Sequence, residues 1–243
     1  MRENKYDDEK FFNKYKNMDR SKKGLAGAGE WHELKKILPD LKNKTLLDLG
    51  CGFGWHCKYA HDKGAKNIVG IDISYNMLKE AQKINNADNI KYECKPIENI
   101  DYEKESFDIV LSSLAIHYIK SFNDLINNVY NVLKTGGYFI FSVEHPIFTA
   151  EGNEEWITDE YDNNLHWPVD NYFDEGIRTT KFLGEEVSKY HRTMTTYLNT
   201  LINKNFEIIN IIEPKPDPDM LSIPGMKDEL RRPMMLIIKA LKK

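Results

Sequence analysis

The sequence lacks any long hydrophobic run. No apolar stretch approaches the roughly 18 consecutive residues of a membrane-spanning helix, and the first ten residues carry charges of both signs, unlike a signal peptide. Hydrophobic residues still make up 41% of the 243 residues and charged residues 30%, as in ordinary globular proteins. We therefore expect one soluble domain over residues 1–243, without a membrane partner.

Cysteine is also scarce. The three cysteines, Cys51, Cys57 and Cys94, form no Cys-x-x-Cys pair. An odd, unpatterned set is typical of free thiols in a reducing compartment, so we expect a cytoplasmic protein. The histidines are not spaced like a metal-binding His-Glu-x-x-His motif either, and we expect no metal.

The chain has no excess of basic residues. Its 34 Lys and Arg are outnumbered by 38 Asp and Glu, for a net charge of −4. Proteins that bind nucleic acids usually show a basic surface, so nothing in the composition predicts such a partner.

Residues 45–54 combine an apolar run with three alternating glycines. Residues 45–49 have the composition of a central strand that is buried on both faces. Gly50, Gly52 and Gly54 then allow positive φ angles and let a ligand approach the backbone closely. A helix is expected over 56–61, with Gly64 to end it. A buried strand, a glycine-rich turn and a helix N-terminus together predict a nucleotide-type binding site.

This turn differs from the two common phosphate-binding motifs. The dinucleotide fingerprint needs glycine where Trp55 stands, and no Lys-(Ser/Thr) follows the turn as in a P-loop. A second apolar strand, expected over 67–72, ends in Asp72, which follows Gly54 by 18 residues. An acid about 20 residues after the turn accepts from ribose hydroxyls in nucleotide-binding folds. Because Ser74 already occupies the next helix-cap position, we expect Asp72 to bind ribose.

The segment Asp48-Leu49-Gly50-Cys51-Gly52-Phe53-Gly54 resembles the first motif of class I S-adenosylmethionine-dependent methyltransferases, (Asp/Glu)-x-Gly-x-Gly-x-Gly, at every fixed position. Residues 107–118 are similar to the family's fourth motif region, and residues 189–193 with 213–214 resemble small bacterial methyltransferases of the type 11 kind. The resemblance implies S-adenosyl-L-methionine as cofactor and S-adenosyl-L-homocysteine as product. It also implies a doubly wound, Rossmann-like α/β sheet of seven strands, in the order 3-2-1-4-5-7-6 with the seventh antiparallel.

The same resemblance implies which residues hold the cofactor. Asp48 suits the ammonium and sulfonium groups, Asp72 the ribose, and the turn at 95–98 the adenine. In that turn Lys95-Pro96 departs from the commoner Asp-small pair. The implied cofactor-binding residues are Asp48, Gly50, Cys51, Gly52, Gly54, Asp72, Ile73, Met77, Ile97, Glu98 and Ser112.

Periodic segments predict the remaining elements. We expect helices over 31–38, 74–84 and 190–203, and one that Ser121 caps and Gly136-Gly137 end. Further strands are expected over 89–94, 107–112, 138–143, 206–212 and 234–241. Residues 1–29 are expected to form an N-terminal arm.

Residues 146–188 are too long for a mere connection, and we expect an inserted lid there, over the acceptor site. Between residues 146 and 177 this segment has nine acids and no Lys or Arg. Five aromatic residues are interleaved with the acids, namely Trp156, Tyr161, Trp167, Tyr172 and Phe173. Acids with aromatics suit a cationic or polar acceptor. A solvated loop anchored by a few aromatic rings is the alternative.

Two histidines are candidate proton acceptors. His117 follows the fourth strand and His145 ends the fifth, and parallel sheets bind ligands beyond the carboxyl ends of their strands. A neutral imidazole can take a proton near neutral pH, although transfer by positioning alone is equally possible chemistry. Tyr118, His191 and Arg192 are expected to line the acceptor site, where Arg192 would pair with an acceptor carboxylate.

We interpret the chain as a methyltransferase acting on an oxygen or nitrogen of a small molecule. Two motifs of base methylation are missing. Ser112-Ser113-Leu114-Ala115 stands in place of (Asp/Asn)-Pro-Pro-(Tyr/Phe), and the sequence has no Pro-Cys dipeptide, which a cytosine C5 methyltransferase would need. A tRNA-modifying methyltransferase and a non-catalytic protein that binds S-adenosylmethionine remain alternatives. The sequence does not predict the oligomeric state.

Overall fold

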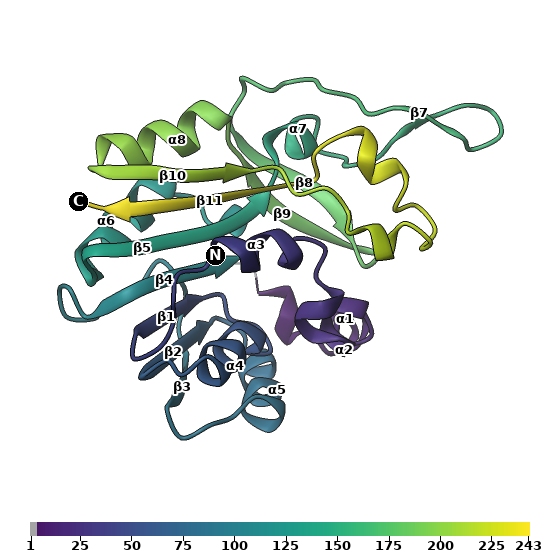
Figure 1. Cartoon of the computed structure of the whole chain (residues 1–243). Helices are drawn as coiled ribbons and strands as arrows, with labels where there is room; N and C mark the ends of the chain where they lie inside the picture. The colour runs from purple at the N-terminus through teal and green to yellow at the C-terminus, as the bar shows by residue number, and fades with distance from the viewer. Residues whose placement is uncertain (1–3) are drawn as a thin grey trace.

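Seven strands form one sheet in the order β10-β11-β5-β4-β1-β2-β3 (Figure 1). The computed structural model describes residues 4–243. The strands are β1 (Thr45–Leu49), β2 (Asn67–Asp72), β3 (Ile90–Cys94), β4 (Phe107–Ser113), β5 (Leu133–Glu144), β10 (Phe206–Ile212) and β11 (Met235–Lys242). Strands β1 to β5 are parallel, and β11 is antiparallel to both β5 and β10. The predicted order and the antiparallel seventh strand are thus confirmed.

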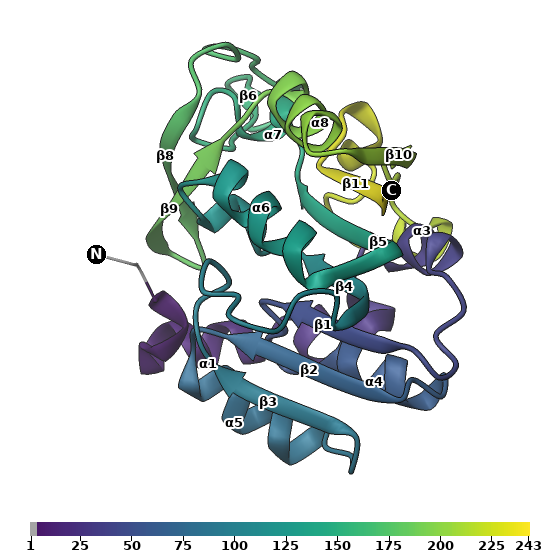
Figure 2. The ribbon, with the colours of Figure 1, turned by 90° about the vertical axis from the view of Figure 1, so that its left-hand side faces the viewer.

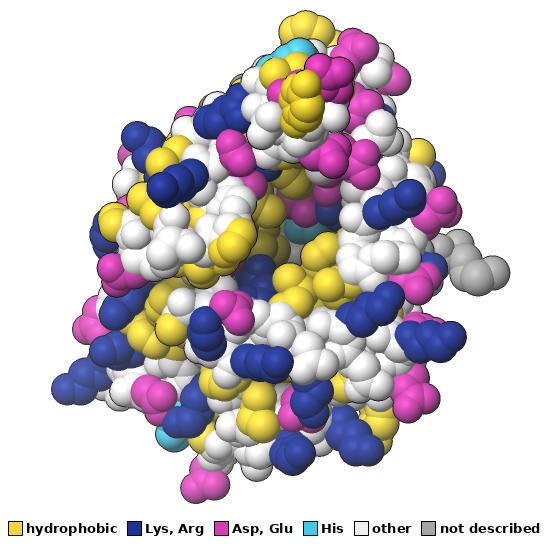
Figure 3. All heavy atoms as spheres, turned by 90° about the vertical axis from the view of Figure 1, so that its right-hand side faces the viewer, with side chains coloured by type: hydrophobic (Ala, Val, Ile, Leu, Met, Phe, Trp, Pro, Cys, Tyr) yellow, Lys and Arg dark blue, Asp and Glu magenta, His cyan; other side chains and the backbone are white. Residues whose placement is uncertain are grey.

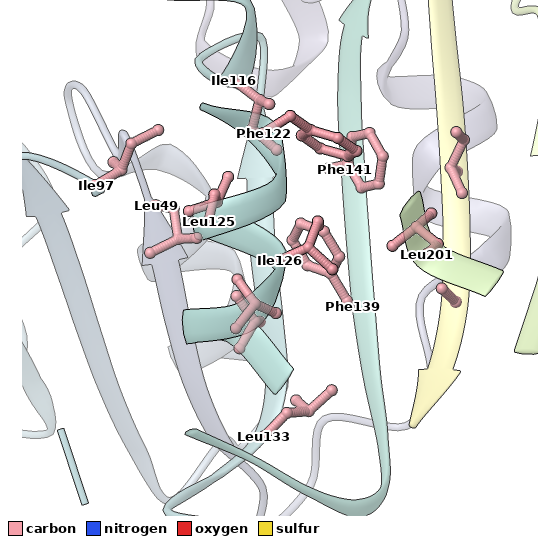
Figure 4. Packing of buried hydrophobic residues seen from close by; sticks show 14 of the residues in the cluster. Leu49, Ile97, Ile116, Phe122, Leu125, Ile126, Leu133, Phe139, Phe141 and Leu201 are labelled. Carbon is pink, nitrogen blue, oxygen red and sulfur yellow. The ribbon is translucent and has the colours of Figure 1, made fainter. Parts of the chain in front are cut away.

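Helices cover both faces of this sheet (Figure 2). The helices that pack against it are α3 (Trp31–Ile37), α4 (Trp55–Asp62), α5 (Tyr75–Ile84), α6 (Phe122–Val132) and α8 (Met194–Asn203). Helices α4 and α5 bury one face and α6 with α8 the other, because successive strand residues point to opposite faces. Figure 4 shows Ile126 of α6 beside Phe139 of β5, Phe122 beside Phe141, and Leu125 beside Leu49 of β1.

The predicted helix caps are present. Ser74 accepts from the Met77 N–H and Ser121 from the Asp124 N–H, which satisfies one free donor at the start of α5 and α6. Ser74 therefore stands beside Asp72 as a cap, and the carboxylate of Asp72 is not needed for that purpose.

Two predicted boundaries are wrong. Helix α6 ends at Val132 and β5 begins at Leu133, which pairs with Phe107, so the glycines at 136–137 lie inside the strand and do not end the helix. Residues 190 and 191 are not helical, because β9 (Glu185–His191) pairs along its whole length with β8 (Gly176–Phe182). Thr193 caps α8 instead.

The segment 146–188 contains α7 (Pro146–Thr149), the pair β6 (Ile157–Thr158) and β7 (Asn164–His166), and most of the β8–β9 hairpin.

The described part of the arm is made of short helices: η1 (Lys5–Asp7), α1 (Glu9–Lys16), α2 (Asp19–Lys22) and η2 (Gly24–Gly27). Residues 1–3 of the predicted arm lie outside the described residues. Three further short helices are η3 (Ile116–Tyr118), η4 (Pro218–Met220) and η5 (Asp228–Arg231). Over residues 4–243, no helix is long and apolar enough to cross a membrane.

Candidate active site

A cavity of about 870 Å³ lies at the carboxyl edge of the parallel strands. The last residues of three strands, Asp72 of β2, Ser113 of β4 and Glu144 of β5, form part of its wall. Figure 3 shows the hollow on this face, with hydrophobic side chains on its wall and charged and histidine side chains deeper inside. Small-molecule sites usually measure about 300–1,000 Å³, so this cavity has room for two reactants.

The glycine turn opens onto this cavity at Gly52. Its φ is +52°, and a Cβ built there would meet no atom within 4 Å. At Gly50 and Gly54, in contrast, a Cβ would lie 2.4 Å from the Cβ of Ala115 and 2.1 Å from the hydroxyl of Tyr92. Packing therefore requires glycine at those two positions, whereas at Gly52 the backbone is left accessible to a ligand.

Asp72 is held against this turn by two backbone donors. Its Oδ2 accepts from the Gly52 N–H at 2.9 Å and its Oδ1 from the Ser74 N–H at 2.8 Å. Burial raises the pKa of Asp72 to about 6. Each carboxylate oxygen can accept a second hydrogen bond, so the side chain can still receive both hydroxyls of a diol in the cavity.

Seven of the eleven residues expected to hold the cofactor line this one cavity: Gly50, Gly52, Asp72, Ile73, Met77, Ile97 and Glu98. Two others belong to the glycine turn but do not line this cavity. Cys51 borders a small adjoining cavity of about 60 Å³, between the turn and the arm, and Gly54 packs against Tyr92.

The remaining two, Asp48 and Ser112, do not reach the cavity. Asp48 is 1% exposed and accepts a hydrogen bond from the Cys57 thiol of α4, because its place in β1 points it to the face that α4 covers. Burial raises the pKa of Asp48 to about 7. Ser112 is fully buried and donates to the carbonyl of Leu49. The direct contact with the cofactor that we expected from these two side chains is therefore not available.

The two candidate histidines have different surroundings. His117 is 2% exposed and lines the cavity, and its Nδ1 has no hydrogen-bond partner in the described part of the chain. Burial lowers the pKa of His117 well below its usual value, and the charges of Lys189 and Arg192 add to this effect. Its imidazole is therefore neutral and has an unused ring nitrogen.

His145 lies away from the cavity wall. Its Nδ1 accepts from the Ile147 N–H at 3.0 Å and so caps α7, and its Nε2 lies 2.8 Å from Oε1 of Glu213. Burial lowers the pKa of His145, and Glu213 opposes that shift. Because His145 does not line the cavity, caps α7 through Nδ1 and places Nε2 beside the Glu213 carboxylate, its placement does not support the role of proton acceptor expected for it.

Only one of the three residues expected to line the acceptor site does so. Tyr118 lines the cavity, with its hydroxyl 3.3 Å from that of Tyr6. The ring nitrogens of His191 lie 2.8 Å from the Thr149 hydroxyl and 2.9 Å from the Tyr172 carbonyl. Arg192 donates to the carbonyls of Ile119 and Lys120. His191 is the last residue of β9 and Arg192 follows it, so the two do not open a helix, and neither lines the cavity.

The aromatic residues of the acid-rich segment are also elsewhere. Trp156 and Trp167 pack on the guanidinium of Arg232, and Tyr172 packs on the His191 ring. Tyr161 and Phe173 are 77% and 90% exposed. The part of 146–188 that does line the cavity is the β8–β9 hairpin, through Ile177, Phe182, Val187 and Ser188.

Sequence reasoning missed an ion pair between the arm and the residue that directly follows it. Arg20 lines the cavity, and its Nη2 lies 3.2 Å from Oε1 of the buried Glu30, which also accepts from the Ser113 hydroxyl at 2.9 Å. Burial alone would raise the pKa of Glu30, but Arg20 lowers it below its ordinary value. Arg20 is one of eight basic residues before position 24, so nothing in the sequence distinguishes it.

It also missed a cluster around Lys189, which lines the cavity from β9. The Nζ atom of Lys189 lies 2.6 Å from Oε1 of Glu144 and 2.9 Å from Oε2 of Glu154. Burial alone would lower the pKa of Lys189, but the two carboxylates raise it. The sequence indicates His145 because parallel sheets bind ligands beyond the carboxyl ends of their strands. The same argument applies to Glu144, the last residue of β5. Among residues 4–243 there is no group of three side chains able to hold a metal ion.

Comparison with known proteins gives consistent matches. Residues 47–141 match a family profile described as a methyltransferase domain. A crystal structure from Listeria monocytogenes, described as an S-adenosylmethionine-dependent methyltransferase, is 58% identical with a TM-score of 0.86, over 90% of this chain and 99% of that chain. An S-adenosylmethionine-dependent methyltransferase from Mesorhizobium loti is 39% identical with a TM-score of 0.83, over 90% of this chain and 100% of that one.

Two curated relatives extend these matches. An uncharacterized protein of Haemophilus influenzae is 34% identical over 98% of this chain and 96% of its own length. A malonyl-[acyl-carrier protein] O-methyltransferase of Enterobacter lignolyticus is 34% identical, but over only 49% of this chain and 46% of its own length.

Proposed function

The chain belongs to the class I S-adenosylmethionine-dependent methyltransferases, and we propose that the acceptor of this enzyme is a small molecule with a nucleophilic nitrogen or oxygen. S-Adenosylmethionine supplies a methyl group on a cationic sulfur, which a nucleophile takes by in-line displacement, leaving S-adenosylhomocysteine. The protein has to align the two reactants and exclude water from the space between them.

We assign the part of the cavity beside Asp72 to the cofactor and call it the cofactor half. The Gly52 and Ser74 N–H groups orient its carboxylate beside an open glycine, which is the arrangement that a ribose diol requires. Ile73, Met77, Ile97 and Glu98 line the same part of the cavity and would surround the adenine. The residues present therefore fit S-adenosylmethionine.

The arm supplies a cation for the amino-acid end of the cofactor. We assign the carboxylate of the cofactor to Arg20, which lines the cavity. Glu30 does not line the cavity and would orient the guanidinium of Arg20 from behind through their ion pair at 3.2 Å.

The enclosure of the cavity supports a small acceptor. Lys14 of the arm donates to the Leu183 carbonyl at the tip of the β8–β9 hairpin, at 2.8 Å, and the Phe11 and Phe182 rings lie 5.9 Å apart. The arm and the hairpin thus meet beside the cavity, and we propose the hairpin as the working part of the lid. The acid-rich stretch before the hairpin would repel a phosphate backbone.

His117 is our candidate for the proton acceptor, because its unused nitrogen belongs to a neutral imidazole on the cavity wall. An acceptor that attacks as a free amine needs no proton acceptor for the methyl transfer itself. For such an acceptor, correct positioning of the two reactants is sufficient.

The test is transfer from S-adenosylmethionine labelled on its methyl group. The enzyme is incubated in turn with a metabolite extract, bulk tRNA and a protein extract, and the label is followed by size fractionation. We expect label in the metabolite fraction. Label in tRNA alone would overturn the proposal in favour of a tRNA methyltransferase, a possibility that a 26% identical tRNA U34 carboxymethyltransferase of Cellvibrio japonicus makes worth testing. Label on acyl-carrier protein in the protein fraction would also overturn it, in favour of an acyl group carried on that protein, as the name of the malonyl-[acyl-carrier protein] O-methyltransferase indicates for that relative.

A further inference from the structure

The cavity has a second half, away from the cofactor-binding turn. Asp72 ends β2 and Glu144 ends β5, and β1 and β4 lie between these strands. At about 4.8 Å per strand, the two ends are roughly 14 Å apart along the edge of the sheet. The half beside β5 is therefore where the acceptor has to lie.

Glu144 places an unsatisfied carboxylate oxygen in this half. Its Oε1 accepts from Lys189, whereas Oε2 is buried without a hydrogen-bond partner in the described part of the chain. The side chain is 13% exposed, on the cavity wall. A carboxylate oxygen accepts hydrogen bonds and cannot donate them, so this buried atom needs a donor, which a ligand in the cavity or an ordered water can supply.

His117 offers a second unsatisfied atom nearby. Its short helix η3 packs against both β5 and β9, and the charge of Lys189 is close enough to lower the pKa of His117. In the neutral tautomer with its proton on Nε2, the unpartnered Nδ1 can accept a hydrogen bond. The wall of the acceptor half thus contains two buried atoms that can each accept one.

The positive charge beside them is already balanced. The ammonium of Lys189 lies within hydrogen-bond distance of both Glu144 and Glu154. The guanidinium of Arg192 is occupied by backbone carbonyls. A ligand carboxylate here would meet the free oxygen of Glu144, and the repulsion between the two carboxylates disfavours it.

Much of the remaining wall is apolar. The hairpin and the segment that leads into β11 contribute Phe182, Val187, Met220, Met226, Met234 and Met235 to the lining of the cavity. Methionine side chains are flexible and fill irregular gaps, so such a wall accommodates apolar ligands of varied shape. Burying each methylene there is worth about 0.8 kcal/mol.

We propose that the methyl acceptor is an amine on an apolar body, whose N–H groups are received by Glu144 Oε2 and His117 Nδ1. This inference rests on the proposed function and names its substrate class. A primary amine has two or more N–H donors, whereas a hydroxyl has one and a carboxylate has none. An alkyl amine is an ammonium at neutral pH and first releases one proton to solvent. The lone pair of the neutral amine then bonds to the methyl carbon, the bond from carbon to sulfur breaks with its electron pair on sulfur, and the methylated amine leaves as its ammonium.

The test measures binding rather than turnover. The protein is saturated with S-adenosylhomocysteine, which fills the cofactor half, and is titrated calorimetrically with hexylamine, hexanol and hexanoate at pH 7.5. We expect hexylamine to bind at least tenfold more tightly than hexanoate. Octylamine should bind about fifteenfold more tightly than hexylamine, because each of its two added methylenes contributes about fourfold.

Glu144→Gln is the critical variant. It should weaken hexylamine binding at least tenfold and leave S-adenosylhomocysteine affinity within twofold of the wild type. Lys189 keeps Glu154 as a partner in this variant, so no buried cation is left unpaired. Glu207→Gln, on the outside of β10, is the matched control and should change neither affinity.

The outcomes separate this inference from the proposed function. Hexanoate binding as tightly as hexylamine, or unchanged hexylamine affinity in Glu144→Gln, overturns the amine assignment. So does the absence of binding by every probe to a protein that binds S-adenosylhomocysteine, and the methyltransferase assignment survives all three results. Failure to bind S-adenosylhomocysteine would instead remove the proposed function itself.

Discussion

Asp7 and Ser74 join the N-terminal arm to the cofactor half of the cavity. The Oδ1 atom of Asp7 accepts from the Ser74 hydroxyl at 2.6 Å and from the Asn76 N–H at 3.0 Å. Ser74 is the cap of α5 and also donates its N–H to Asp72. One side chain of the arm is thus anchored beside the residue that we assign to the ribose.

Removing this anchor should loosen the arm. Asp7→Ala removes the hydrogen bonds that Asp7 accepts from Ser74 and Asn76. We expect S-adenosylhomocysteine to dissociate at least fivefold faster from this variant in stopped-flow measurements, with a smaller change in its association rate. Asp88→Ala, an exposed acid near the end of α5, is the control. Equal dissociation rates in both variants would mean that the arm does not restrain the ligand.

Cofactor affinity should depend on the protonation of Asp72. Burial raises its pKa to about 6, and only the carboxylate can accept from both ribose hydroxyls. Affinity should therefore be constant above pH 7 and decrease as the pH falls through about 6. Asp72→Ala should lose roughly 1.5–3 kcal/mol of binding free energy at pH 7.5. Calorimetry that finds wild-type affinity in the folded variant contradicts the ribose assignment.

Arg20 can be tested with a truncated ligand. Arg20→Lys and Arg20→Met should weaken S-adenosylhomocysteine binding, with the larger loss for Met, because the fork of Arg20 would pair with the carboxylate of the ligand. Both variants should bind 5′-methylthioadenosine, which lacks the amino-acid end, as the wild type does. Lys23→Met on the exposed side of the arm serves as control. Equal losses for the two ligands would show that Arg20 only supports the fold.

Asp48 should limit the stability of the free protein. Its pKa rises from an ordinary value of 3.8 to about 7 on burial, so the folded state holds a proton that the unfolded state releases. Stability is therefore lost as the pH rises from about 4 to 7. Asp48→Asn should remove a cost of up to about 4 kcal/mol at pH 8 and have little effect at pH 4.5. Thermal melts at both pH values check this, and a variant less stable at pH 8 would refute it.

The two histidines should respond differently to alanine. His145→Ala removes the cap of α7, which should cost about 1 kcal/mol of stability without changing S-adenosylhomocysteine affinity. His117→Ala should fold normally and lower turnover at saturating cofactor on the order of a hundredfold if the imidazole accepts a proton. The acceptor found in the labelling experiment is the substrate for that assay. Near-normal turnover of His117→Ala across pH 6 to 9 would mean that positioning alone is used.

Local sequence was sufficient for the cofactor half of the cavity. The glycine turn, the strand that ends in Asp72 and the Ser74 cap are contiguous or nearly so, and each is set by short-range constraints on backbone angles and capping. The motif resemblance supplied the strand order. These parts of the fold agree with the structure because neighbouring residues carry the information.

The acceptor half was decided only by tertiary structure. Residues 185–191 become a strand because they pair with β8, a partner that no local pattern identifies, and this pairing brings Lys189 to Glu144 and turns His191 away. Asp48 is buried rather than accessible because α4 covers the face of β1 to which its side chain points. Arg20 and Glu30 gain their position from the packing of the arm on the sheet edge. Charge and residue type were visible in the sequence, but the direction of each side chain depends on long-range pairing.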